Sequence, residues 1–129
     1  MSLGELVAHV VEIPGWVGNI VEQPSIDLAG AEHVERPTYK SNVELLSAFD
    51  QNVAKARAAI ASKSDAQMME SWSLKNGEKV LVTLPKAGVL RSFLLNHLIH
   101  HRGQLSVYIR LKDVPVPSIY GPSADETGF

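Results

Sequence analysis

The longest helical pattern in the chain is residues 84–111, LPKAGVLRSFLLNHLIHHRGQLSVYIRL. Pro85 suits the first turn of a helix, and only two glycines weaken the pattern that follows. We therefore predict one long helix over 86–113. Apolar side chains occupy much of its circumference, so this helix needs burial on nearly all sides. They are Leu90, Phe93, Leu94, Leu95, Leu98, Ile99, Leu105, Val107 and Ile109.

Three of the five histidines of the chain lie within five positions of this predicted helix. Each helical residue advances by about 100°, so His97 and His101 stand about 40° apart, while His100 lies about 60° to the other side of His97. The stripe that we expect to be buried centres on the side of His97 toward His101. It contains Leu90, Leu94, Leu98, Leu105 and Tyr108. We therefore expect His97 and His101 to point inward and His100 to lie on the flank.

The start of the chain predicts a second helix. Ser2 and Glu5 have the S-x-x-E spacing of a capping box, and the apolar residues that follow recur with the period of an amphipathic helix. These features predict a helix over 3–22. Pro14 lies inside it, so we expect a kink or a local break near residues 10–14.

Capping and turn residues predict the other segments. Ser41 and Glu44 repeat the capping-box spacing, and Asn76-Gly77 between alternating apolar residues is typical of a hairpin with a type I′ turn. The predicted segments are a loop at 23–40, a helix at 42–62, a short helical turn ending at Met69, a two-stranded hairpin within 71–84 and a proline-rich tail at 114–129 without regular structure.

Length and composition indicate one soluble globular domain over residues 1–129, in which 45% of residues are hydrophobic and 20% are charged. A net charge of -2 gives no basic field for a phosphate backbone, so we expect no nucleic-acid partner. The apolar start is interrupted by charged residues and a proline, so we expect neither a signal peptide nor a membrane span. Cysteine is absent, which is compatible with a cytoplasmic protein and leaves histidine and carboxylate as the strong metal ligands.

His9 is the third candidate ligand, because it shares its helical face with Ile13, Trp16 and Ile20. Three neutral imidazoles, from His9, His97 and His101, suit Zn²⁺ or another borderline divalent ion and leave coordination positions open for water or substrate. The alternative is that these histidines only pack and hydrogen-bond in the core. For His33, in a polar loop, and for His100, an exposed position without a ligand role is favoured.

Several neighbours could assist such a site. Glu5 or Glu12 could orient the imidazole beside them or move protons, and the planar guanidinium of Arg102 could bind a substrate carboxylate or pair at the surface. Trp16 and Trp72 could line a pocket or pack in the core. From these, Arg102, Glu12 and Trp16 are taken as the candidates for substrate binding.

Three stretches resemble the DinB-like proteins: SLGELVAHVVEIPGW at 2–16, the long stretch at 84–111, and VPVPSIYGPSADE at 114–126. The resemblance covers nearly the whole chain and is most specific in HHRGQLSVYIRL and IYGPSADE. It implies an all-α bundle of four helices in an up-down-down-up arrangement, related to metal-dependent thiol transferases and isomerases. It also implies that His9, His97 and His101 bind a divalent ion, zinc or nickel.

Members of that family begin with a helix that precedes SLGEL, so we expect this chain to contribute three long helices and to lack the first one. The apolar surface left open should then be buried by a partner, and a homodimer is the simplest arrangement. Leu95 and Ile99 face away from His97 and are our candidates for the subunit contact. The alternative is that the 23–40 loop and the tail cover this surface within one chain.

The resemblance implies a metal-dependent enzyme of the thiol transferase or hydrolase type, with a thiol cofactor and an unknown substrate. A non-catalytic metal-binding or stress-associated module, or a dimeric scaffold with a vestigial site, is the alternative. An accessible coordination position beside three histidines would favour catalysis, whereas a closed site would favour the alternative.

Overall fold

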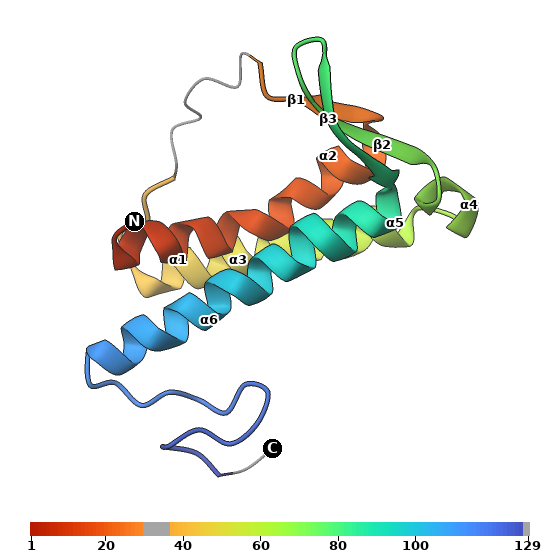
Figure 1. The fold of residues 1–129 in the computed structure, drawn as a ribbon. Coiled ribbons are helices and arrows are strands. Elements are labelled where there is room, and N and C mark those ends of the chain that lie inside the picture. The colour runs from red at the N-terminus through yellow and green to blue at the C-terminus, as the bar shows by residue number, and fades with distance from the viewer. Residues whose placement is uncertain (30–36, 128–129) are drawn as a thin grey trace.

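The computed structural model describes residues 1–29 and 37–127, in which three helical runs pack together and a small sheet lies at one end (Figure 1). The first run contains α1 (Leu3–Glu12), the 3-10 turn η1 (Ile13–Gly15) and α2 (Trp16–Glu22). The second is α3 (Asn42–Ala61), and the third contains α5 (Lys86–Val89), the π-helix η2 (Leu90–Leu95) and α6 (Asn96–Leu111). The remaining elements are the single-turn helix α4 (Asp65–Met68) and three strands. These strands are β1 (Ser25–Asp27), β2 (Ser71–Asn76) and β3 (Lys79–Pro85).

The first helical run follows its local sequence closely. The Ser2 hydroxyl accepts from the Glu5 amide and the Glu5 carboxylate accepts from the Ser2 amide, which confirms the predicted capping box. Pro14 lies in the 3-10 turn at Ile13–Gly15 that separates α1 from α2, so the predicted break is found at the C-terminal end of the expected range. The run therefore stays helical from 3 to 22 but changes its winding in the middle.

α1 is the central helix, because it contacts both α3 and α6. The predicted start of α3 is confirmed by the Ser41 hydroxyl, which accepts from the Glu44 amide. On the facing side, the Asn52 amide donates to the carbonyl of Val11 over 2.9 Å. This hydrogen bond fixes the position of α3 along the axis of α1. Its acceptor is a backbone carbonyl close to the 3-10 turn.

The long helix is confirmed, but it ends at Leu111 rather than 113, and its first third differs from an ordinary α-helix. Residues 90–95 form a π-helix, whose last bond joins the amide of Asn96 to the carbonyl of Arg91. A π turn contains an extra residue, so it rotates the preceding side chains relative to those of α6. Leu94 in the π-helix and His101 in α6 are both buried.

The sheet is larger than the predicted hairpin. β2 and β3 pair antiparallel, and β1 adds a parallel strand to β2, with Ile26 opposite Leu74. The prediction of a loop over 23–40 is therefore wrong at Ser25–Asp27, because this short strand forms only through pairing with a distant segment. Because the chain also contains this sheet, the predicted all-α class describes it incompletely.

The hairpin turn also differs from the predicted one. Asn76 pairs with Lys79, so the two central residues are Gly77 and Glu78 rather than Asn76 and Gly77. Of these two central residues, both of which the structure describes, only Gly77 has a positive φ, at 60°. A type I′ turn needs a positive φ at both central positions. Glycine at the first central position fits a type II′ turn, and the Asp27 carboxylate accepts from the Gly77 amide over 2.9 Å.

The main hydrophobic core lies where the helices meet the sheet. Its buried residues are Ile13, Val17, Ile20, Val21, Ala56, Trp72, Val89, Leu90 and Leu94. Trp72 is thus a core residue, as the packing alternative for it predicted. Within the described residues, no helix is both long and apolar enough to cross a membrane.

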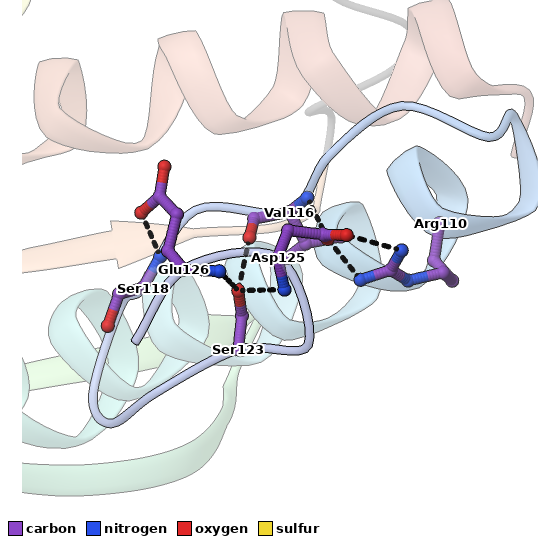
Figure 2. A network of polar contacts seen from close by, with 6 residues as sticks. All are labelled: Arg110, Val116, Ser118, Ser123, Asp125 and Glu126. Carbon is purple, nitrogen blue, oxygen red and sulfur yellow. Dashed lines mark hydrogen bonds and ion pairs between the residues drawn. The ribbon is translucent and has the colours of Figure 1, made fainter. Parts of the chain in front are cut away.

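The tail beyond α6 has no regular structure, as predicted, but its polar groups form a dense network (Figure 2). Asp125 pairs with the Arg110 guanidinium and accepts from the amide of Val116 over 2.8 Å. The Ser123 hydroxyl donates to the Val116 carbonyl and accepts from the amides of Asp125 and Glu126. This network ties the tail to the last turns of α6.

The long helix is not buried on nearly all sides by its own chain. Leu95 and Ile99 remain 45% and 49% exposed, so the described part of the 23–40 segment and the tail do not cover them. Phe93, Val107 and Leu111 are also exposed. The alternative, in which the 23–40 loop and the tail cover this surface, is not seen in the described residues.

Candidate metal centre

Three histidines from two helices converge between α1 and α6. Nε2 of His97 lies 2.9 Å from Nε2 of His9 and 2.8 Å from Nε2 of His101. The three donor atoms all lie within 4.8 Å of one another. His9 and His101 are buried and His97 is half-buried. The structure therefore brings together the three histidines that helical periodicity selected.

Outer partners orient two of the imidazole rings. The Nδ1 atom of His101 lies 2.7 Å from Oε1 of Gln104, and an amide oxygen can only accept, so Nδ1 carries the proton. On α1, Nδ1 of His9 faces the Glu12 carboxylate at 3.9 Å, which favours the same tautomer. In the ring of His101 this leaves Nε2 with a lone pair directed at the centre of the cluster.

The two contacts of His97 cannot both be good hydrogen bonds. Its Nε2 faces two other ring nitrogens, yet a neutral ring nitrogen has either one hydrogen or one lone pair. One proton on His97 could be shared only by two bent, weak hydrogen bonds. A cation that accepts all three lone pairs satisfies the cluster fully.

The donor set fits a divalent metal ion of the borderline class. The three donor nitrogens lie within 4.8 Å of one another, close enough for all of them to reach one ion. Three neutral imidazoles are ligands that zinc, nickel and related ions accept. The geometry and the chemistry of these side chains therefore agree on this class of ligand.

Burial favours the metal-binding form of His97. Its pKa is lowered, first by loss of solvation and then by the neighbouring His101 and His100. The ring is therefore neutral at neutral pH, and only a neutral imidazole can coordinate a metal.

An aromatic wall and a cavity flank the cluster. The Trp16 ring lies 5.5 Å from the His9 ring and 5.3 Å from the His97 ring, between centroids, so it shields one side from water. A cavity of about 430 Å³ lies beside His97 and His101. Its lining residues are Ser92, Phe93, Asn96, His97, His100 and His101. A larger cavity of about 550 Å³, between α1 and the segment before α3, contains none of the three histidines.

The predicted substrate-binding residues have different positions. Glu12 and Trp16 contact the histidine cluster, whereas Arg102 is exposed and does not line the cavity beside it. His100 is exposed as expected, but its ring lies 4.9 Å from that of His101 and it lines the cavity. His33 lies outside the described residues.

Gln104, Asn96 and Ser92 were not among the predicted site residues. Gln104 lies three positions after His101, a spacing that places side chains together on a helix. Ser92 and Asn96 share a helical row with His100, since they lie eight and four positions before it. These spacings are signals that could have been read once the ligands were chosen.

Comparison with known proteins agrees with this architecture. The model of the DinB family matches residues 1–127. Over 39 residues, the chain is 49% identical to the uncharacterized protein YrdA of Bacillus subtilis (strain 168), a match that spans 30% of this chain and 23% of YrdA. A crystal structure of a DinB-like protein, YjoA of Bacillus subtilis, is similar with a TM-score of 0.66 and 19% identity over 99% of this chain and 76% of that chain, a likeness that shows the fold. The chain belongs to the DinB family.

Proposed function

We propose that the chain binds a divalent metal ion through His9, His97 and His101 and acts as a metal-dependent enzyme of the thiol transferase or hydrolase type. The observation that carries this proposal is the convergence of three Nε2 atoms, with the ring of His101 held from outside by Gln104. We propose zinc or nickel as the ion, because both are well suited to imidazole ligands.

When bound, the ion would supply a Lewis acid that polarises a carbonyl group or lowers the pKa of a thiol. The protein's own groups have distinct tasks around it. Gln104 holds the ring of His101, Glu12 lies beside that of His9 as a candidate proton acceptor, and Trp16 excludes water from one side. The cavity beside His97 and His101 gives a small molecule access to the ligands, which favours catalysis over a closed structural site.

Metal analysis of protein purified without an affinity tag tests this function. We expect one ion per chain, and we expect a chelator to lower the melting temperature. A ligand that binds only the folded state adds about 2.7 kcal/mol when its free concentration is a hundred times its dissociation constant. A protein that contains no metal, and whose melting temperature responds to neither metal nor chelator, would refute the proposal.

We further propose that the chain forms one cytoplasmic domain that assembles as a homodimer, in which a second copy covers Leu95 and Ile99. For the order of the helices in the bundle, we propose the up-down-down-up arrangement. The exposure of both side chains supports the contact, since burial of apolar surface contributes about 25 cal/mol per Å². Sedimentation over a dilution series should show a dimer that Leu95→Glu or Ile99→Glu dissociates. A wild-type monomer at low micromolar concentration that both variants match would contradict the contact.

A further inference from the structure

The cavity beside the histidines is built from two parallel rows of side chains on one helical run. One row, Phe93, His97 and His101, contains two of the metal ligands. The other row, Ser92, Asn96 and His100, lies next to it, and we refer to these three residues as the polar row. A molecule bound to the ion from this cavity would therefore lie against the polar row.

The charge of the cavity favours an anion. Among the described residues that line it, none carries a carboxylate. Arg91 adds a cation at the edge, where its Nη1 donates to Oδ1 of Asn96 over 2.6 Å. Three neutral imidazoles around a divalent ion leave the charge of that ion uncompensated, so a negative group is attracted from both sides.

Asn96 is held in the orientation that an anion requires. Because Arg91 occupies Oδ1, the remaining polar group of this side chain is Nδ2, which has two N–H donors. The Ser92 hydroxyl, another donor, lines the same cavity. Two donors in one row suit the two oxygens of a carboxylate.

We propose that the polar row is a binding subsite for a small carboxylate, with Asn96 as the residue that positions it beside the metal ion. This inference rests on the proposed metal site. It assigns the carboxylate to Asn96 and Ser92 rather than to Arg102, which lies outside the cavity lining.

Acetate binding to the Co²⁺-loaded protein tests the subsite, because the visible absorption of Co²⁺ responds to added ligands without any enzymatic assay. We expect Asn96→Leu to weaken acetate binding about tenfold, the effect of losing one hydrogen bond to a charged group. Asn96→Asp keeps the size of the side chain but repels the anion, so it should weaken acetate binding further. The affinity for Co²⁺ should stay unchanged in Asn96→Leu, since Asn96 is not one of the three proposed ligands.

Matched variants and a second probe complete the experiment. Asn19→Leu makes the same chemical change at an exposed position of α2 and should leave acetate binding unchanged. Binding of 2-mercaptoethanol, a thiol without a carboxylate, should not depend on Asn96.

The outcomes separate the subsite from the metal site. Acetate binding that is insensitive to Asn96, or that falls more in Arg102→Leu than in Asn96→Leu, overturns the subsite alone. An equal loss in Asn19→Leu also overturns it. A wild-type protein that binds no Co²⁺ overturns both the proposed function and the subsite that rests on it.

Discussion

The histidine cluster and the tail network are both dense groups of polar side chains, but they differ in how completely their hydrogen bonds are satisfied. In the tail, both carboxylate oxygens of Asp125 face donors from the Arg110 guanidinium and the Val116 amide, and the Ser123 hydroxyl both donates and accepts (Figure 2). In the cluster, three ring nitrogens converge, and the two contacts of His97 cannot both be good hydrogen bonds. A satisfied network stabilises structure, whereas converging nitrogens that hydrogen bonds cannot satisfy indicate a place for a cation.

Removal of a central imidazole should have the largest effect. We expect His97→Ala or His101→Ala to abolish tight metal binding, because each removes one of three ligands, while His100→Ala should leave it nearly intact. Isothermal titration of metal-free protein measures all three variants. Equal losses at all three positions would mean that the inward face of α6 is assigned wrongly.

Acid should separate the two polar clusters. An imidazole must be neutral to bind metal and its ordinary pKa is about 6.5, so metal should leave as pH falls below about 6. The pKa of Asp125 is lowered by Arg110 and the Val116 amide, so its stabilisation is present above the ordinary value of 3.8 and is lost only as pH falls through the lowered one. Metal content after dialysis and amide exchange of the tail should therefore change at different pH values. Full occupancy near pH 4 would argue for carboxylate ligands instead.

The outer partner of His101 should have an intermediate effect. Gln104→Leu removes the acceptor that holds Nδ1 protonated, and loss of such a partner typically weakens metal affinity 10- to 100-fold, roughly. Gln104→Glu restores an acceptor and should recover most of the affinity. If leucine and glutamate behave alike at this position, the contact does not orient the ring.

The tail network should matter least for the rest of the molecule. Asp125→Ala removes the acceptor for Arg110 and Val116, so amide exchange across the tail should accelerate. The melting temperature of the helices should change by less than about 4 °C, because the ion pair is on the surface. Metal affinity should stay unchanged. A large loss of metal affinity would show that the tail and the cluster are coupled.

Much of the site could be predicted from the sequence because helical periodicity determines which residues share a face. The choice of His97 and His101, at positions i and i+4, required no tertiary information, and neither did the choice of His9 on an amphipathic helix. The π-helix at 90–95 and the strand at Ser25–Asp27 could not be predicted this way, since both depend on packing against distant segments. The hairpin was located correctly, but its turn type depended on which residue pairs with Lys79.

X-ray absorption at the zinc edge of the loaded protein tests the central claim most directly, because it counts imidazole ligands and measures their distances. We predict three imidazole nitrogens at about 2.0–2.1 Å in the wild type. We predict fewer in His9→Ala, since this variant removes the ligand that α1 contributes. A wild-type spectrum with fewer than three imidazoles, or an unchanged number in His9→Ala, would contradict the account.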